Sequence, residues 1–105
     1  MPKVEFIARG VLVEGGRVLL CRNVKHGYLY LPGGHIEFGE SAAAAVAREL
    51  MEEGELEVRV GEPAMASEEV FEAGGKRHHE LNLVFHVERT GDEPIESRES
   101  EIGFE

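Results

Sequence analysis

The chain has 105 residues, 42% hydrophobic and 30% charged, a composition typical of one ordinary globular domain rather than a disordered or fibrous chain. Its formal net charge of −10 argues against a basic groove that binds long nucleic acid. No apolar run approaches the roughly 20 residues of a membrane span, and no signal peptide is recognisable. We therefore expect a single domain, residues 1–105, in the cytoplasm, with no membrane partner.

The first part of the chain predicts short strands. Residues 4–13 and 17–22 alternate like two strands joined by a tight turn at a glycine pair. Residues 29–31 read as a further short strand, which Pro32 ends. The single cysteine, Cys21, has no partner for a disulfide, and nothing around it suggests activation. We interpret it as a packed core thiol rather than a catalytic one.

The second part predicts one helix followed by more strands. We expect the helix from about Ala42 to Glu53, with Ser41 as its N-cap and Gly54 as its end. Several strands around one central helix predict an α+β or mixed α/β domain. The expected strands after the helix are 56–60, 65–73, 80–89 and a short one starting at 102, with a turn at 74–79.

The C-terminal segment is short for a complete domain of this kind. A strand that begins at Ile102 has four residues, and no helix follows it. Two explanations stay open. Either the sequence is truncated at its C-terminus, or another chain covers the missing surface, for example in a homodimer.

The predicted helix carries its carboxylates beside its apolar stripe. We take Val46 as the centre of the stripe and turn about 100° per residue. Glu53 then lies about 20° from this centre, Glu49 about 60° and Glu52 about 120°. Like charges at these spacings repel, partial burial raises the cost, and the C-terminal end of a helix disfavours anions. Three unfavourable contributions to stability at one place are typical of a functional site.

A bound cation would remove each of these penalties. Residues 34–56 hold six glutamates against one arginine, Arg48, which concentrates half of the net charge of the chain on one segment. Dense carboxylate oxygens suit one or two Mg²⁺ or Mn²⁺ ions, with water completing the coordination. Such ions would also let an acidic protein bind a phosphate substrate. A solvated acidic helix edge is the alternative.

The segment GHIEFGESAAAAVARELMEEGEL, from Gly34 to Leu56, resembles the Nudix box. Gly34, Glu40 and the run REL-MEE at 48–53 stand at its fixed positions, and Pro32 and Gly33 precede it as in Nudix hydrolases. The resemblance implies a Nudix-like α/β/α sandwich with a mixed sheet. It also implies hydrolysis of a nucleoside diphosphate linked to another group, with Mg²⁺ or Mn²⁺ as cofactor.

One position departs from the pattern of the box. The family usually has glycine two residues after the paired glutamates, where this chain has Glu55, and Gly54 comes one residue earlier. We expect the helix to end one residue early or to use a different C-cap geometry. The metal-binding glutamates precede this change, so we expect the activity to be kept.

The resemblance also implies roles for individual residues. Glu49, Glu52 and Glu53 would be catalytic and bind metal, and one of them would act as general base on the attacking water. The carbonyl of Gly33 would be a further metal ligand. Arg48 would pair with Glu40 and tie the loop to the helix, which is a structural role.

Family members often recruit another carboxylate from outside the box. The candidates here are Glu80, Glu99 and Glu101, and we prefer Glu101 or Glu99 because the acidic segment before the last strand resembles that region. For each of them, a solvated surface glutamate is the alternative.

Signals for substrate binding are weaker. Arg77 and His78 belong to the most basic spot in the chain and could contact phosphate, although a solvated hairpin tip explains them equally well. Tyr30 could stack on a base. The same holds for Tyr28, Phe38 and Phe71, with packing as the alternative for all four.

Two classes of function compete. The first is a metal-dependent pyrophosphohydrolase acting on a small nucleotide or nucleotide derivative. The second is a non-catalytic Nudix-like domain that senses or binds a nucleotide. Domains of the second kind typically lose one or more box glutamates, whereas Glu49, Glu52 and Glu53 are all present here. The sequence therefore favours the enzyme.

Overall fold

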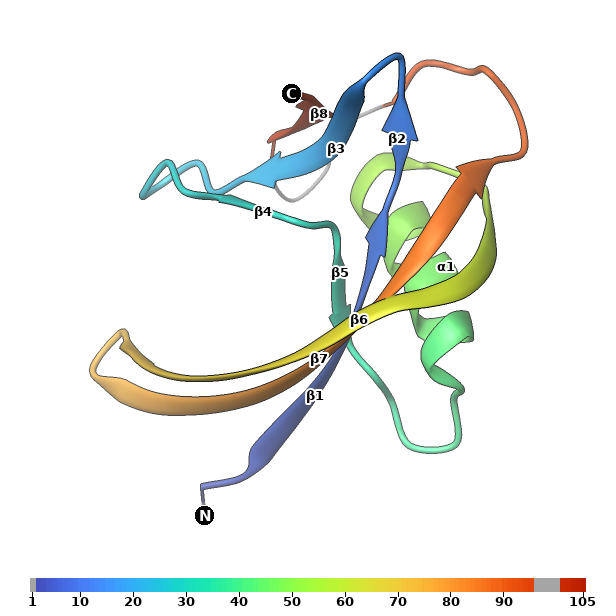
Figure 1. Ribbon diagram of the computed structural model, residues 1–105. Coiled ribbons are helices and arrows are strands. Elements are labelled where there is room, and N and C mark those ends of the chain that lie inside the picture. Colours follow the sequence, from blue (N-terminus) through green and yellow to red (C-terminus); the bar gives the residue numbers. More distant parts are fainter. Residues whose placement is uncertain (1, 96–100) are drawn as a thin grey trace.

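The structure is a computed structural model that describes residues 2–95 and 101–105 (Figure 1). Glu99, one of the carboxylates considered above, lies outside these residues. In chain order the elements are β1 (Val4–Val11), β2 (Val13–Glu14), β3 (Arg17–Arg22), β4 (Leu29–Tyr30), β5 (Gly33–His35), α1 (Ala42–Gly54), β6 (Val58–Ala73), β7 (Lys76–Arg89) and β8 (Glu101–Phe104).

The larger sheet has the strand order β5-β1-β7-β6. Strand β1 runs parallel to β7 and antiparallel to β5, and β6 and β7 form an antiparallel hairpin. The predicted α/β domain with a mixed sheet is therefore confirmed. A parallel pair needs a long connection, and here the chain between β1 and β7 contains the helix and the loop that leads into it.

The smaller sheet is built around β3, which pairs antiparallel with β2, β4 and β8. The turn between β2 and β3 is the predicted glycine pair. Gly15 and Gly16 have φ angles of 59° and 76°, and a two-residue turn with positive φ at both positions matches the twist of its flanking strands. The predicted strand beginning at Ile102 is present as β8.

The hairpin of β6 and β7 is longer than the sequence predicts. The two predicted segments 56–60 and 65–73 are joined in one continuous strand, β6, which begins at Val58 and has register shifts on either side of Pro63. A proline cannot donate to the sheet, and a bulge accommodates it without ending the strand. The predicted turn at 74–79 is too long, because Lys76 already belongs to β7. The outer half of this hairpin, residues 65–83, forms an arm that extends away from α1 (Figure 1).

Helix α1 begins as predicted and ends later than predicted. The Oγ atom of Ser41 accepts a hydrogen bond from the backbone N–H of Ala44 at 3.0 Å. The helix continues through Gly54, so the expected end one residue early is wrong. Glu55 is the C-cap, with a φ of 51° in the left-handed region, a conformation that costs a residue with a side chain roughly 1–2 kcal/mol.

The core joins the helix to both sheets. Gly10 of β1 lies under the helix, where an added Cβ would stand 3.2 Å from Val46. Residues 2–95 and 101–105 contain one helical layer, and the smaller sheet contributes Leu19 to the same core. No helix in this part of the chain is long and apolar enough to cross a membrane. The buried core cluster consists of Ala8, Leu12, Leu19, Ala45, Val46, Leu50, Leu56 and Val87.

Candidate active site

Glu53 is the most buried carboxylate of the helix, with a relative exposure of 5%. Its Oε1 accepts a hydrogen bond from the backbone N–H of Gly33 at 2.9 Å, and its Oε2 accepts one from the Sγ of Cys21 at 3.2 Å. Gly33 belongs to β5 and Cys21 to β3, so both sheets hold the same carboxylate. The thiol of Cys21 is fully buried, as expected for a core residue.

Glu49 lies against the glycine loop that precedes the helix. A Cβ added to Gly34 would stand 2.5 Å from the carboxyl carbon of Glu49. A glycine at this position therefore leaves the space that the Glu49 carboxylate occupies. Gly33 is also constrained, since it has a φ of 151° and an added Cβ would clash with the carbonyl oxygen of Ala8.

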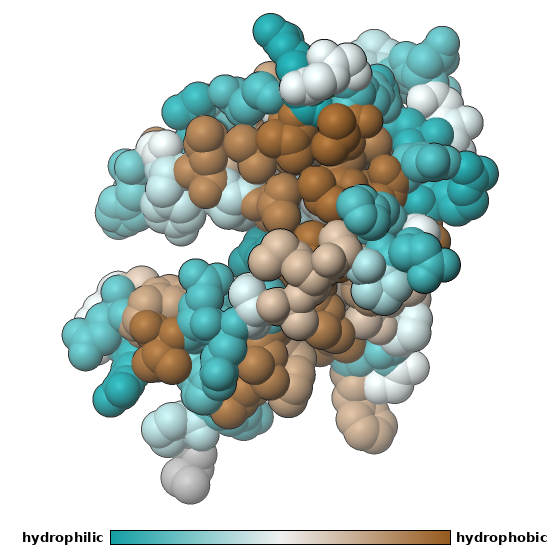
Figure 2. All heavy atoms as spheres, in the orientation of Figure 1, coloured by the Kyte–Doolittle hydropathy of each residue, from teal (hydrophilic) through white to brown (hydrophobic). Residues whose placement is uncertain are grey.

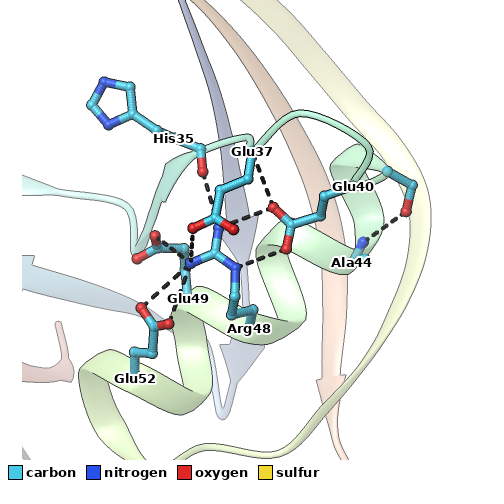
Figure 3. Close-up of polar contacts among 8 residues, drawn as sticks. His35, Glu37, Glu40, Ala44, Arg48, Glu49 and Glu52 are labelled. Carbon is cyan, nitrogen blue, oxygen red and sulfur yellow. Dashed lines mark hydrogen bonds and ion pairs between the residues drawn. The ribbon is translucent and has the colours of Figure 1, made fainter.

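Arg48 stands at the centre of the cluster (Figure 3). Its Nε and Nη2 atoms donate to the two oxygens of Glu40 at 2.7 and 3.0 Å, and Nη2 also donates to the carbonyl of His35 at 3.0 Å. Its Nη1 donates to Glu49 at 3.1 Å and to Glu52 at 3.3 Å. The predicted contact with Glu40 is present, and its structural role stays a prediction.

The electrostatics follow from this geometry. The hydrogen bonds that Arg48 donates to Glu40 are the main cause that raises the pKa of Arg48 above its ordinary value. Arg48 in turn lowers the pKa of the Glu40 carboxyl, assisted by the backbone N–H of Glu37. The carboxylate of Glu37 lies 3.9 Å from Arg48 as well. Four carboxylates around one guanidinium leave the cluster with surplus negative charge.

The donor set can be tested against the divalent ion that the family resemblance implies. Among the described residues, no three His, Cys, Asp or Glu side chains form a group that could hold a metal ion. Glu49 and Glu52 turn toward Arg48, while Glu53 faces Gly33. Carboxylate and carbonyl oxygens with surplus negative charge nevertheless fit Mg²⁺ or Mn²⁺ chemically. The oxygen ligands present are therefore of the kind that such an ion needs. In this structure, the side chains of Glu49 and Glu52 point toward Arg48 and do not converge on one point with Glu53.

Glu101 is not brought to this cluster. It pairs with Arg22 across β3 and β8, and its Oε2 lies 3.6 Å from the Nε of Arg22. Cross-strand partners share one face, and neighbours on a strand point to opposite faces. Glu101 therefore lies on the opposite face of the smaller sheet from Cys21 and Glu53. Its assignment as a metal ligand stays a prediction.

The three residues predicted to bind substrate lie in two different pockets. Arg77 and His78 line a pocket of about 780 Å³ together with Val4 and Val70. Tyr30 lines another pocket, which we call the tyrosine pocket. Phe38 is fully exposed and lines neither. The tyrosine pocket has a volume of about 430 Å³, and its main lining residues are Arg9, Tyr28, Tyr30, Glu69, Phe71 and Glu80.

Sequence reasoning missed three residues near these sites. Arg9 and Asn82 form a partly buried polar contact, with Arg9 Nε donating to Asn82 Oδ1 at 2.9 Å. The signal for Asn82 was a polar residue inside the apolar strand pattern ELNLVFHV. Glu5 was also missed. It bonds to His35 Nε2 at 2.8 Å and to His78 Nδ1 at 3.0 Å, and these contacts lower the pKa of its carboxyl.

Comparison with known proteins gives a consistent result. The family model of the NUDIX domain matches residues 1–104. A MutT NUDIX hydrolase from Burkholderia pseudomallei has a TM-score of 0.81 at 21% identity, covering 97% of this chain and 82% of that one. A MutT protein from Bacillus halodurans has a TM-score of 0.79 at 26% identity, covering 96% and 67%. An ADP-ribose pyrophosphatase from Streptococcus suis has a TM-score of 0.74 at 18% identity, covering 97% and 73%.

The mixed sheet, the one helix of residues 2–95 and 101–105 and the carboxylates along it define an α/β protein of the Nudix fold, as do these neighbours. The chain belongs to the Nudix family. Enzymes of this family typically cleave nucleoside diphosphates linked to another group, and they generally use a divalent metal ion. Of the glutamates of the box, Glu49, Glu52 and Glu53 belong to α1, and Glu53 accepts hydrogen bonds from both sheets.

Proposed function

We propose that this chain hydrolyses the diphosphate of a nucleoside diphosphate linked to another group, with Mg²⁺ or Mn²⁺ held by Glu49, Glu52, Glu53 and the carbonyl of Gly33. The observation that carries this proposal is the burial of Glu53. A carboxylate with 5% exposure, held by two donors from different sheets, is placed at considerable cost. A purely structural helix would place an apolar residue there.

The three glutamates differ in how firmly they are held, and this supports a division of work. Glu53 is fixed by Gly33 and Cys21. Glu49 accepts a hydrogen bond from Arg48, and its carboxylate packs against Gly34. Glu52 is half-exposed and contacts Arg48 at 3.3 and 3.4 Å. We expect Glu53 to stay in place when an ion binds, while Glu52 turns away from Arg48.

The bound ion would supply charge neutralisation of the diphosphate and activation of water. The chain itself supplies the remaining elements of the reaction. Arg48 keeps the carboxylates of Glu49 and Glu52 at one edge of the helix until an ion competes for them. One of the three glutamates accepts a proton from the attacking water as general base. The glycine loop keeps side chains away from the site, so that a diphosphate can approach.

The test compares the wild-type chain with Glu53→Gln on a panel of substrates. The panel contains nucleoside di- and triphosphates, ADP-ribose, nucleotide sugars and dinucleoside polyphosphates, each with Mg²⁺ or Mn²⁺, and mass spectrometry identifies the products. We expect cleavage within a diphosphate, which Glu53→Gln slows by about 10²–10⁴-fold. Glu62→Gln removes one charge from an exposed strand position and serves as the matched control.

A second readout does not depend on turnover. Titration with Mn²⁺, followed by electron paramagnetic resonance, should show weaker binding to Glu53→Gln and unchanged binding to Glu62→Gln. A folded chain that binds Mn²⁺ and a nucleotide, but cleaves no member of the panel, would favour the non-catalytic binding domain instead. Location in the cytoplasm and homodimer formation stay predictions from the sequence.

A further inference from the structure

The tyrosine pocket is a hollow between the smaller sheet and the arm of β6 and β7. Tyr28 and Tyr30 line it on one side, and Glu69 and Phe71 of the arm line it on the other. Figure 2 shows this hollow between the upper and lower parts of the molecule. Its volume of about 430 Å³ lies within the range of small-molecule sites. The pocket is therefore large enough for a nucleobase.

The pocket is adjacent to the carboxylate cluster through the strand pairing. Arg9, which lines the pocket, is the strand partner of Gly33, whose N–H donates to Glu53. Tyr30, which also lines it, is the strand partner of Cys21, whose thiol donates to Glu53. Paired residues on neighbouring strands lie about 4.5–5.5 Å apart at Cα. A nucleotide with its diphosphate at Glu53 can therefore reach the pocket with its base.

The walls of the pocket offer flat faces on both sides. The rings of Tyr28 and Tyr30 have centroids 5.7 Å apart and an interplanar angle of 50°, and the Cζ of Arg9 lies 5.9 Å from the centroid of Tyr30. On the arm, Phe71 stacks with the ring of His78 at 5.2 Å. Aromatic rings and guanidinium planes are the groups on which nucleobases stack in proteins.

Arg9, Glu69 and Glu80 of the pocket belong to one polar network, which also includes the buried Asn82. Asn82 is 2% exposed and accepts from Arg9, which also donates to the carbonyl of Leu31 at 2.8 Å. Arg9 is thus fixed by the protein itself. Glu80, with a side-chain exposure of 14%, lies 4.0 Å from Arg9. Glu69 and Glu80 each contact the amide of Asn82 at a long 3.5 Å, so both carboxylates keep acceptor capacity.

We propose that the tyrosine pocket binds the nucleobase of the substrate, and that Glu69 and Glu80 select bases with an exocyclic amino group. An ionised carboxylate accepts hydrogen bonds and donates none. Cytosine and adenine present an amino group as donor, and guanine presents a ring N–H beside its amino group, which can pair with both oxygens of one carboxylate. Uracil and thymine carry a carbonyl oxygen where cytosine has its amino group. The carboxylates would repel that oxygen.

This inference rests on the proposed function for the position of the diphosphate, and its test separates the two. Nucleoside monophosphates contain no diphosphate, so their affinity can be measured whether or not the chain is catalytic. Isothermal titration with CMP and UMP, and with GMP and IMP, compares pairs that differ in the amino group. We expect CMP and GMP to bind about 10-fold more tightly than their partners.

Substitutions then assign the discrimination to the two carboxylates. Glu80→Gln and Glu69→Gln should each reduce the preference for CMP, measured as the ratio of the CMP affinity to the UMP affinity, to below about 3-fold. The reason is that glutamine can also donate a hydrogen bond to a carbonyl. Glu68→Gln is the matched control. Glu68 neighbours Glu69 on β6 but contacts His79 on the other face at 2.7 Å, and its loss should leave the ratio unchanged.

Three results would overturn the inference. They are equal affinity for the members of each pair, no measurable binding of any of the four monophosphates, and an unchanged ratio in both glutamine variants. Loss of Mn²⁺ binding in Glu80→Gln would instead make Glu80 a metal ligand and remove it from base selection. Base-selective binding without diphosphate cleavage would support this inference and contradict the proposed function. Diphosphate cleavage without base preference would support the proposed function and contradict this inference.

Discussion

The two arginines of the site, Arg48 and Arg9, stand in opposite chemical surroundings. Arg48 is enclosed by carboxylates, with Glu40 as its bidentate partner. Arg9 donates to a neutral amide and a carbonyl and lies over the ring of Tyr30. Arg48 therefore shares its surroundings with four carboxylates, whereas Arg9 contacts neutral groups and an aromatic ring and has one carboxylate, that of Glu80, at 4.0 Å.

This difference separates two kinds of ligand. The surplus charge around Arg48 attracts a cation, because bringing several carboxylates together is costly until positive charge is added. The surroundings of Arg9 instead favour a flat polar ring, since they combine aromatic faces with fixed hydrogen-bonding groups. If both proposals hold, Arg48 lies at the phosphate end of the substrate site and Arg9 at the base end.

The largest expected effect comes from filling the space next to the carboxylates. Gly34→Ala would place a Cβ 2.5 Å from the carboxyl carbon of Glu49 and displace that side chain. Displacements of about 1 Å can cost about 10²-fold in rate, and we expect a loss of this order in kcat/KM. Gly91→Ala is the control, since a Cβ there meets nothing within 4 Å. Equal activity of the two variants would show that the position of Glu49 does not matter.

The next prediction tests whether Arg48 occupies the carboxylates that would otherwise bind a metal ion. Arg48→Met leaves half-buried carboxylates without a partner, and we expect a loss of about 2 kcal/mol in the free energy of unfolding without metal. Mg²⁺ should then stabilise this variant more than the wild type, because the carboxylates are no longer engaged by the guanidinium. Urea unfolding with and without Mg²⁺ measures both quantities.

Arg89→Met provides the matched control for this comparison. Arg89 forms a fork with Glu14 at 2.7 and 2.9 Å, outside the box helix. We expect a loss of stability without any increase in the Mg²⁺ effect. A similar Mg²⁺ response in both variants would mean that Arg48 does not compete with the ion.

The dependence of stability on pH should show a smaller effect of the two arginine–glutamate pairs, Arg48–Glu40 and Arg89–Glu14. Arg48 lowers the pKa of Glu40, and Arg89 lowers the pKa of Glu14, each from an ordinary value of 4.5. A depressed pKa stabilises the fold above the unfolded pKa, and this contribution disappears as pH falls through the folded pKa. Thermal melting from about pH 7 to about pH 3 should therefore show a destabilisation by Glu40→Gln that shrinks below about pH 4.5. A constant difference across this range would contradict the assignment.

The sequence predicts the carboxylate edge well because its information is local. Glu49, Glu52 and Glu53 follow from the spacing on one helix, and Gly34 belongs to the same continuous motif. Strand pairing, by contrast, brings together residues that are far apart in the chain. The contacts of Arg9 with Asn82 and of Cys21 with Glu53 depend on which strands become neighbours. No spacing rule in the sequence contains that information.

One further difference between the predicted and the observed fold has an identifiable physical cause. Pro63 and its neighbours suggest a break between two strands, but a bulge lets β6 continue through them. The assignment of Glu101 as a metal ligand, which was made from its position along the chain, stays a prediction. The face on which its side chain lies follows from its register with Arg22, which cannot be derived from the sequence alone.

The smallest effect concerns the end of the helix, and it serves as a control for both arginine regions. Glu55 adopts a φ of 51°, where a residue with a side chain is strained and glycine is not. We expect Glu55→Gly to raise the free energy of unfolding by about 1 kcal/mol, as measured by urea unfolding. Activity and base preference should stay unchanged, because Glu55 follows the three glutamates proposed as metal ligands in the chain and lines neither the tyrosine pocket nor the pocket of Arg77 and His78. A destabilised variant would show that the contacts of the Glu55 side chain outweigh its backbone strain, and that the departure from the usual glycine of the box is compensated within this chain.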